Sequence, residues 1–266
     1  MERFTTLLLF LLLFTSACVL KAKADGILST YYYQELCPIA EEIVRQHVET
    51  EVYQDPNVAA QLLRLHFHDC FVMRGGPSWE VYLGRKDSLK ASFNEANRRI
   101  PAPNSTLETL IANFEDHGLD IVDLVSLSGA HTIGRSRCTS FKQRLYNPQP
   151  FEQVWDVRQH EYFQLLRSQC PEEGHDNDLV PLDIKTPRRF DNLYYINLLR
   201  GHALLTSDSQ LVTDDTPEYI VSNLVWQYAF DQRLFFQHFV NSMLKMGNIG
   251  VLTVEGEVRH NCRYIN

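Results

Sequence analysis

The sequence predicts a mainly α-helical fold, because apolar residues recur at helical spacing in several segments while strand signals are few and short. With 266 residues, 44% of them hydrophobic and 22% charged, the chain can bury a large core and has an ordinary globular composition. No internal repeat is visible. We therefore expect one compact, mainly α domain.

The first 24 residues differ in kind from the rest. Arg3 precedes an apolar run over residues 7–14, and residues 22–24 fit a small-residue cleavage site. The run is shorter than the roughly 20 residues that span a bilayer, so a removable secretory signal over residues 1–24 is favoured over an uncleaved anchor. The domain is then expected to occupy residues 25–266.

Charge and cysteine content narrow the partners and the compartment. The formal net charge of −8 becomes −10 once the signal, with Glu2, Arg3, Lys21 and Lys23, is removed. No basic cluster stands out, so we expect neither nucleic acid nor an anionic membrane as a partner. The 6 cysteines include Cys18 of the signal. An odd number remains in the mature chain, so at least one must be free or linked to another molecule.

Caps and breaks place the helices in order. The predicted helices run from Pro38 to the break at residues 55–57, from there to about Phe67, and over residues 106–114, 120–128, 162–167, 192–199 and, with breaks, 216–246. Ser105 is the expected cap of the third helix and Asp120 that of the fourth. Residues 72–105 are rich in turn signals.

The second helix carries Arg64 and His68 four residues apart, so both share one face. A guanidinium steadies developing negative charge, and an imidazole can take and return a proton near neutral pH. The pair suits a reaction in which a bound molecule loses a proton and an oxygen leaves as an anion. For an isolated pair, a surface Arg and a packed His is the commoner explanation. A zinc site on His66, His68 and Asp69 is a remote alternative, because the two His point to different sides of a helix.

A second cluster, DLVSLSGAHTIGRSRC over residues 123–138, places His131 after a predicted helix and among small residues. The small residues 128–130 would let its imidazole lie close beneath a flat cofactor, although a lone His there is more often structural. Downstream, LLTSDSQL places Asp208 between leucines. A carboxylate in apolar surroundings needs a partner, and the N–H of a ligand imidazole would be one.

Three motifs, LLRLHFHDCF, LVSLSGAHTIG and LLTSDSQL, followed by MGNIGVLT and GEVRHNCR, resemble those of the secretory plant haem peroxidases (class III). The resemblance runs from about Asp25 to Asn266. It implies a haem-peroxidase-like helical fold, with one haem b between a distal and a proximal helical part. It also implies an enzyme that reduces hydrogen peroxide while oxidising small phenolic donors by one-electron steps.

The resemblance gives each clustered residue a role. His68 is implied as the distal acid–base residue and Arg64 as the distal charge stabiliser. His131 is implied as the haem iron ligand, and Asp208 as its hydrogen-bond partner, which makes the imidazole a stronger electron donor. Pro101 matches the proline of the donor site at the haem edge.

The family also binds two calcium ions. The resemblance implies an intact proximal site, whose oxygen ligands suit a hard cation: Thr132, Asp183, Thr186, the carbonyl of Arg189, and Asp191. Of the distal site only Asp69 and the Val72 carbonyl remain, so we expect only the proximal ion. Asn104 opens a glycosylation sequon that would suit a secreted loop.

The resemblance is interrupted between Val72 and Gly75. In the family these points are separated by several dozen residues, which carry two distal helices, distal calcium ligands and the Asn that orients the distal His. The fold is therefore expected to lack part of its distal side. Cys138 and Cys170 are expected to pair, whereas three cysteines lose partners that lie in the missing block: Cys37, Cys70 and Cys262.

The loss of three disulfides suggests an alternative function. Each typically stabilises a secreted domain by about 2–5 kcal/mol, against a total stability of roughly 5–15 kcal/mol. An inactive or unstable peroxidase relative, which binds haem weakly or not at all, is therefore the alternative to an active enzyme. We expect a monomer. The chain ends soon after Cys262 without the tail that the resemblance associates with some vacuolar members, so the resemblance implies secretion to the cell wall, with the vacuole the less favoured location.

Overall fold

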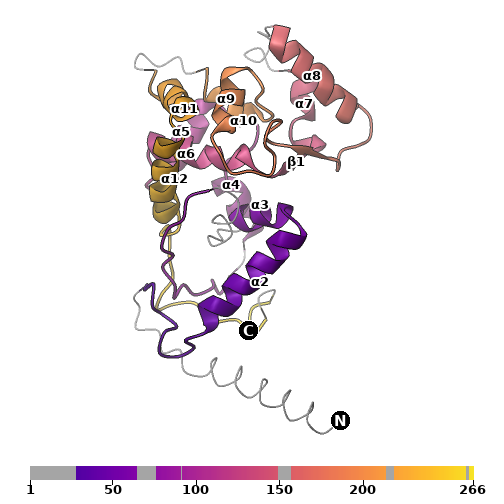
Figure 1. Cartoon of the computed structure of the whole chain (residues 1–266). Helices are drawn as coiled ribbons and strands as arrows, with labels where there is room; N and C mark the ends of the chain where they lie inside the picture. The colour runs from indigo at the N-terminus through magenta and orange to yellow at the C-terminus, as the bar shows by residue number, and fades with distance from the viewer. Residues whose placement is uncertain (1–27, 65–75, 91, 149–156, 214–218, 262–263) are drawn as a thin grey trace. The chain divides into compact units, whose positions relative to one another are not determined.

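The computed structural model describes residues 28–64, 76–90, 92–148, 157–213, 219–261 and 264–266 (Figure 1). The elements are α2 (Ala40–Gln54), α3 (Asn57–Arg64), α4 (Phe93–Arg99), α5 (Leu107–Glu115), α6 (Ile121–Ser128), η2 (Gly129–Thr132), β1 (Arg135–Arg137), η3 (Cys138–Ser140), α7 (Lys142–Tyr146), α8 (Val157–Gln169), β2 (Leu179–Pro181), α9 (Leu193–Leu199), α10 (Thr206–Gln210), α11 (Ile220–Phe230) and α12 (Gln232–Met246). The described part is mostly helical, which confirms the predicted fold class. None of its helices has the length and apolar character needed to cross a membrane.

The chain divides into two compact units. The smaller unit combines Met1–Thr50, Glu80–Ala91 and Gly250–Asn266, and the larger combines Glu51–Trp79 and Ser92–Ile249.

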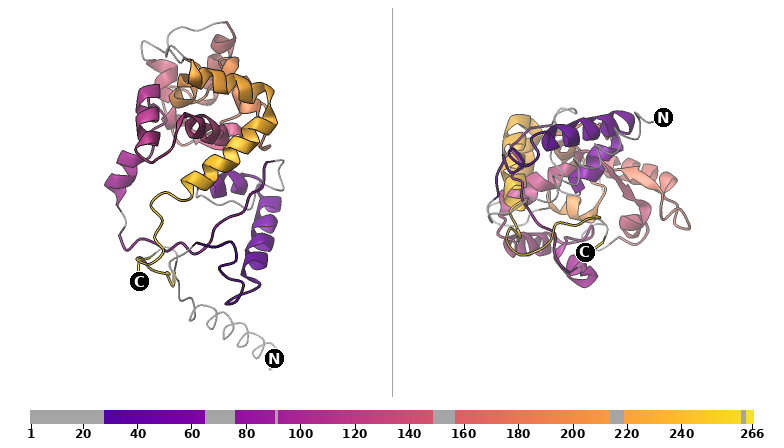
Figure 2. Two further views of the ribbon diagram at one scale, coloured as in Figure 1. Left: turned by 90° about the vertical axis from the view of Figure 1, so that its left-hand side faces the viewer. Right: turned by 90° about the horizontal axis from the view of Figure 1, so that it is seen from below.

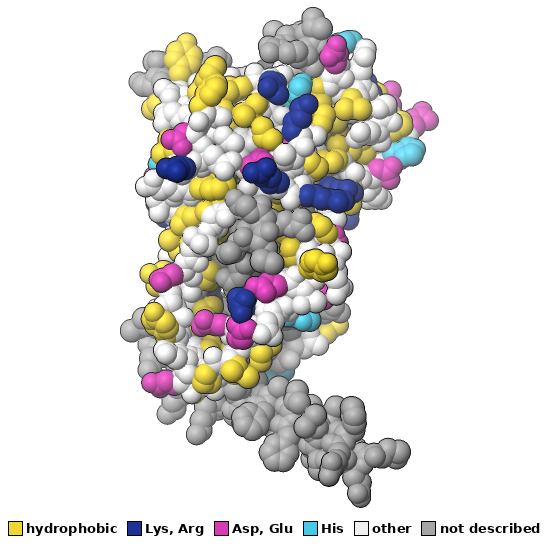
Figure 3. Space-filling view, viewed as in Figure 1, with side chains coloured by type: hydrophobic (Ala, Val, Ile, Leu, Met, Phe, Trp, Pro, Cys, Tyr) yellow, Lys and Arg dark blue, Asp and Glu magenta, His cyan; other side chains and the backbone are white. Residues whose placement is uncertain are grey.

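On the face drawn in Figure 3, Lys and Arg side chains lie singly or in small groups among acidic and apolar ones. That face therefore carries no extended basic patch among the described residues.

The smaller unit is held together by backbone pairing between segments that are distant in sequence. Antiparallel bridges join Ser29 to Leu83 and Asp87 to Glu257. Gly84 has φ +104°, and a Cβ there would lie 2.8 Å from the Tyr32 ring. Only glycine adopts this conformation without strain, so the backbone between the two bridges depends on it.

The apolar stripe of α2 is not covered. Ile39, just before the helix, is 62% exposed, and Ile43 and Val44 within it are 55% and 53% exposed. Three neighbouring aliphatic side chains in water indicate a helix face without its partner.

Helix α6 lies at the centre of the larger unit and packs against α5, α11 and α12 (Figures 1 and 2). Its start matches the predicted cap, because the Asp120 carboxylate accepts the Asp123 N–H at 3.0 Å and the Asp123 carboxylate accepts the Asp120 N–H at 2.9 Å. This reciprocal capping box satisfies backbone donors that a helix end leaves unpaired. It fixes where the chain leaves α6 towards η2.

Interlocked aromatic rings form the core beside α6. They come from the segment before α9 and from α9, α11 and α12, and they include Phe190, Tyr195, Tyr228, Phe235 and Phe239, each with 0% exposure. Neighbouring rings stack or meet edge to face, with centroids 4.9 Å to 5.9 Å apart. Such contacts add to the stabilisation that burial alone provides.

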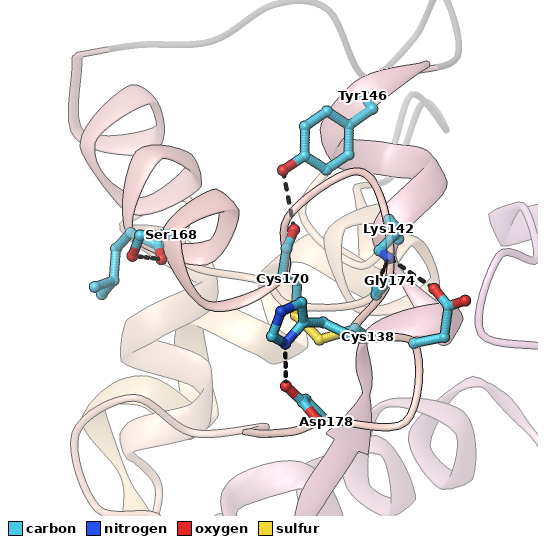
Figure 4. Close-up of a disulfide and its surroundings, with 10 residues drawn as sticks. Cys138, Lys142, Tyr146, Ser168, Cys170, Gly174 and Asp178 are labelled. Atoms are coloured by element: carbon cyan, nitrogen blue, oxygen red, sulfur yellow. Dashed lines mark hydrogen bonds and ion pairs between the residues drawn. A yellow bond between two sulfur atoms is a disulfide. The ribbon is translucent and has the colours of Figure 1, made fainter.

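A second cluster surrounds the disulfide between Cys138 and Cys170 (Figure 4). The Tyr146 hydroxyl donates to the Cys170 carbonyl at 2.9 Å, and Lys142 Nζ lies 2.6 Å from an Asp176 carboxylate oxygen. Strands β1 and β2 pair antiparallel beside it, with Arg135 opposite Pro181. The disulfide and the strand pair together brace the chain between η2 and α9.

Two details of the predicted helices were wrong. Thr106, not Ser105, caps α5, because its backbone is extended and its hydroxyl accepts the Thr109 N–H at 3.4 Å. The turn-rich stretch also contains α4 (Phe93–Arg99), which follows several turn residues and carries two arginines in its last turn.

Candidate active site

The site is built around His131, which lies in the 3-10 turn η2 directly after α6. Its Nδ1 lies 2.8 Å from Asp208 Oδ1. The Asp208 side chain is only 4% exposed, whereas that of His131 is 35% exposed. Among the described residues no hydrogen-bond partner is found for His131 Nε2, so this nitrogen is available to a ligand.

Helix α10 holds Asp208 in place. Asp208 is in its first turn, and the second carboxylate oxygen accepts the backbone N–H of Leu205 at 3.4 Å. The segment before α5 approaches the same helix, because the Ser207 N–H donates to the Pro103 carbonyl at 3.0 Å. A carboxylate anchored in this way fixes the tautomer and the orientation of the imidazole.

Tyr194 is a third member of the site that the sequence did not indicate. Its hydroxyl donates to Asp208 Oδ1 at 2.9 Å, the same oxygen that faces His131. The rings of Tyr194 and His131 meet edge to face, 6.2 Å apart. The stretch NLYYINLL contains only the signal of a buried helix, so this contact could not be predicted without the tertiary structure.

Electrostatics at the site favour a polarised imidazole. Burial opposes protonation of His131, but the Asp208 carboxylate outweighs burial and raises its pKa. Burial, reinforced by the charge of Asp208, raises the pKa of Tyr194 well above its ordinary value. Tyr194 therefore stays a neutral hydroxyl and a permanent donor to the carboxylate.

Small residues before His131 allow close packing. A Cβ on Gly129 would lie 2.3 Å from the Tyr195 hydroxyl and 2.5 Å from the Phe235 ring. No larger side chain fits between the turn and these rings, so η2 is pressed onto the aromatic core. The residues present therefore fit the proximal side of a haem: a fixed imidazole, one open nitrogen and a buried carboxylate behind it.

The residue after His131 begins a buried oxygen cluster. Thr132 Oγ1 lies 3.4 Å from Asp183 Oδ2 and 3.3 Å from Asp191 Oδ1. Thr186 Oγ1 lies 3.1 Å from the same Asp191 oxygen. Arg189 contributes an exposed guanidinium whose Nε lies 3.6 Å from Asp191 Oδ2.

The charges of this cluster suit an oxygen-seeking cation. Asp183 is 0% exposed and Asp191 4% exposed. Burial, with a further contribution from the Asp191 charge, raises the pKa of Asp183. Two buried carboxylates that repel each other are stabilised by a hard cation. Among the described residues, no three His, Cys, Asp or Glu side chains form a metal-binding group, so any ion here would also need hydroxyl and carbonyl ligands.

The distal residues are only partly placed. Arg64 is the last residue of α3, and its side chain is outside the description, as are residues 65–75. The predicted roles of His68, Asp69, Cys70 and Val72 therefore lie outside the described residues, and so does the zinc alternative on His66.

Helix α3 nevertheless contacts the turn after His131. A Cβ on Gly134 would lie 3.1 Å from the Ala60 Cβ. A solvent-open pocket of about 250 Å³ lies here, lined by Pro56, Asn57, Ala59, Ala60, Ile133, Gly134, Pro187 and Arg188. This volume includes open solvent, and the enclosed part is only about 10 Å³, far below the roughly 300–1,000 Å³ of typical ligand pockets, so we do not assign the pocket to a cofactor.

The remaining predicted residues lie at the surface or outside the description. Pro101 and Asn104 are exposed, in the segment before α5. Cys37 has a free thiol. Cys262 lies outside the described residues.

Comparisons with known proteins point to one family. Residues 72–231 match the profile of the family described as Peroxidase. Peroxidase 20 of Arabidopsis thaliana is 47% identical, over 88% of this chain and 90% of that protein. Peroxidase 9 of the same plant is 42% identical, over 88% of this chain and 86% of that protein.

The comparisons also bear on the interrupted motif. Peroxidase 49 of Arabidopsis thaliana is 38% identical and aligns over 333 positions, covering 100% of both chains. Because this chain has 266 residues, at least 67 aligned positions have no residue in it. The family profile match begins at Val72, where the sequence places the junction.

Proposed function

Because this chain belongs to the plant peroxidase family, we propose that it is a secreted haem peroxidase that reduces hydrogen peroxide and oxidises small phenolic donors by one-electron steps. The observation that carries the proposal is the 2.8 Å contact between His131 Nδ1 and a buried Asp208 oxygen, with His131 Nε2 open to a ligand. When bound, haem would supply the iron at which peroxide is reduced. His131 Nε2 would ligate that iron, and Asp208 would keep the Nδ1 proton on the far side of the ring.

The distal roles come from the resemblance. His68 would take the proton of the bound peroxide and return it to the leaving oxygen. Arg64 would stabilise the negative charge that develops on that oxygen. Pro101 would lie at the edge where phenolic donors approach.

Calcium at the proximal oxygen cluster belongs to the same proposal. Thr132 and the two carboxylates, with Thr186 and the Arg189 carbonyl, would hold one ion directly beside the iron ligand in sequence. The ion would offset the repulsion between Asp183 and Asp191 and so keep η2 in place. Asp69 and Val72 would be the remnant of a distal site that no longer binds.

Secretion is the last part of the proposal. Residues 1–24 would be removed as a signal, and residues 25–266 would form a single monomeric domain outside the cell. The exposed Asn104 and the Cys138–Cys170 disulfide suit an oxidising compartment. The three cysteines Cys37, Cys70 and Cys262 would remain unpaired.

A second candidate function is a non-catalytic relative. The observation that favours it is the set of at least 67 aligned positions without a counterpart in this chain. The missing block would remove the support of the distal His and the partners of several cysteines.

One experiment separates the two functions. The secreted chain is purified, its haem Soret band is recorded, and peroxide-dependent guaiacol oxidation is measured. A Soret band with turnover supports the enzyme, a Soret band without turnover supports the non-catalytic relative, and no haem at all overturns the haem peroxidase.

The proximal assignment has its own matched pair of variants. His131→Ala is expected to abolish the Soret band, whereas His160→Ala, at an exposed position on α8, should leave it intact. Equal haem binding by both variants would contradict the assignment of His131.

A further inference from the structure

A row of aromatic rings leads from His131 through the core. The Tyr194 ring lies 6.2 Å from His131 and 5.0 Å from Tyr195, and the Tyr195 ring lies 5.1 Å from Tyr228. The three tyrosines are 3%, 0% and 0% exposed. Electron tunnelling weakens exponentially with distance, so short steps between such rings move a charge faster than one long step over the same span.

The last tyrosine of the row has a partner of a different kind. The Tyr228 hydroxyl lies 2.6 Å from Nδ1 of His238, which is partly exposed on α12. The Tyr195 hydroxyl donates instead to the Val125 carbonyl at 2.9 Å, which is a poor proton acceptor. Tyr194 donates to an Asp208 oxygen that His131 already faces.

This difference determines which tyrosine can hold a stable radical after losing an electron. A phenol that loses an electron becomes a strong acid, so its radical is stable only when a base takes the proton. An imidazole nitrogen in hydrogen-bond contact is such a base. Among the described residues, only Tyr228 of the three tyrosines has its hydroxyl in hydrogen-bond contact with an imidazole.

We propose that Tyr194, Tyr195 and Tyr228 form a one-electron relay that ends at Tyr228, with His238 as the proton acceptor. The inference rests on the proposed function, because hydrogen peroxide reduced at the haem must supply the oxidising equivalent. Tyr228 gives up one electron through the two other rings, and the oxidised haem site is reduced by one equivalent. The phenolic O–H bond breaks, its proton passes to His238 Nδ1, and a neutral tyrosyl radical remains.

The relay would be closed by a second electron transfer. A phenolic donor at the surface gives one electron to the Tyr228 radical, the proton returns from His238 to the phenolate oxygen, and the donor releases its own proton to water. Oxidising equivalents would thus leave the haem pocket through the proximal side of the protein. Burial, with the charges of Asp120 and Asp123, raises the pKa of Tyr228, which keeps the resting phenol protonated.

The test uses the full haem-loaded chain, mixed with hydrogen peroxide without a donor and frozen for electron paramagnetic resonance. A neutral tyrosyl signal is expected, and Tyr228→Phe should remove most of it. Tyr195→Phe should weaken it by interrupting the row. Tyr162→Phe is the matched control, because Tyr162 is also buried but contacts Phe163 and His202 instead, and its signal should equal that of the parent.

The role of His238 is separated from a structural one by two substitutions. His238→Gln keeps a hydrogen-bond acceptor but removes the base, and His238→Leu removes both. Both variants should lose the long-lived radical, with the Soret band unchanged. A radical of normal lifetime in His238→Gln would show that only the hydrogen bond matters and would overturn the proton-acceptor role.

A haem-free arm distinguishes failure of the relay from failure of the proposed function. Without a Soret band, the proposed function fails, and the full chain is then oxidised by a photogenerated oxidant in solution. A long-lived tyrosyl signal that Tyr228→Phe removes supports the terminus of the relay. A signal unchanged in Tyr228→Phe, with or without haem, overturns it, as does the absence of any long-lived tyrosyl signal.

Discussion

A single carboxylate oxygen links the two donors of the site. Asp208 Oδ1 lies 2.8 Å from His131 Nδ1 and 2.9 Å from the Tyr194 hydroxyl. The two contacts act in opposite directions on the imidazole. The carboxylate draws the Nδ1 proton away and makes the ring a stronger ligand, whereas the phenol takes up part of the same electron density. If His131 ligates the haem iron as proposed, its strength as a ligand would be set by a competition between these two hydrogen bonds.

This competition predicts opposite shifts of the iron reduction potential. Asp208→Asn should raise the potential and lower peroxide turnover by roughly 10–100-fold, the usual cost of losing the hydrogen-bond partner of a metal-ligating histidine. Tyr194→Phe should lower the potential, because the carboxylate then acts on His131 alone. Spectroelectrochemistry of the two haem-loaded variants measures both shifts. Shifts of the same sign would contradict the shared-oxygen argument.

The sequence predicted part of this site and missed part of it. His131 and Asp208 were identified from motifs 77 positions apart, and the structure brings their side chains together. Tyr194 was missed because an aromatic residue in an apolar helix is usually a core residue, and its hydroxyl partner is set only by how α9 packs. The other half of the predicted site, around His68, lies outside the described residues, so its geometry stays a prediction.

At the scale of elements, α6 connects the candidate site to the rest of the larger unit. The helix is capped by Asp120 and Asp123, and it ends where η2 presents His131. Lys245 of α12 lies 3.0 Å from Asp120 Oδ2 and 2.8 Å from Asp123 Oδ2. The start of the helix is thus tied to a neighbour, which limits how far its other end can move.

The cap of α6 predicts a dependence of stability on pH. Burial raises the pKa of Asp120, but hydrogen bonds from the Asp123 and Val122 backbone and from Lys245 outweigh burial and lower it below 3.8. A lowered pKa means that the carboxylate stabilises the fold above that value and loses this effect as the pH falls through the lowered one. Asp120→Ala should therefore cost about 1 kcal/mol at neutral pH and less in acid. Urea unfolding at both pH values measures this, and an equal loss at both would contradict it.

A buried hydroxyl predicts a second stability effect between α6 and α12. The Ser242 hydroxyl donates to Asp123 Oδ1 at 2.6 Å and accepts from Ser126 at 2.8 Å. Ser242→Ala should destabilise the protein by about 1–3 kcal/mol, because it leaves buried polar atoms without a partner. Ser168→Ala, at an exposed position on α8, should change stability by less than about 0.5 kcal/mol. Similar losses for both variants in urea unfolding would show that the buried network is unimportant.

Elements were easier to predict than their ends. The Asp120 cap was predicted because capping residues act locally. The cap of α5 was wrong by one residue, since Ser105 and Thr106 can both cap a helix and only the backbone geometry decides between them. The first helix was predicted from Pro38 and α2 begins at Ala40, but periodicity alone cannot show whether another element covers its apolar residues.

At the scale of the whole molecule, this chain is shorter than the relative it aligns with along its full length, and the resemblance implies that the shortfall lies between Val72 and Gly75. The alignment to Peroxidase 49 leaves at least 67 positions without a residue, and the exposed side chains of Ile39, Ile43 and Val44 show an apolar helix face in water. We interpret the exposed face as one consequence of the loss. Removal of the partners of Cys37, Cys70 and Cys262 would be another, and it could be inferred only through the resemblance.

Restoring the block should restore stability, and this is the sharpest test of the whole-molecule argument. The corresponding segment of Peroxidase 20, which is 47% identical to this chain, would be inserted between Val72 and Gly75. Each disulfide regained should add about 2–5 kcal/mol to the free energy of unfolding. The matched control is the same insert with its cysteines changed to Ser, which should cover apolar surface but form none of these bonds.

If the two inserts gave equal stability, the cysteines would not be what the chain lost, and burial of the exposed helix face would have to account for the gain. If neither insert stabilised the chain, the described fold would be self-sufficient, and the junction at Val72 would have no structural cost.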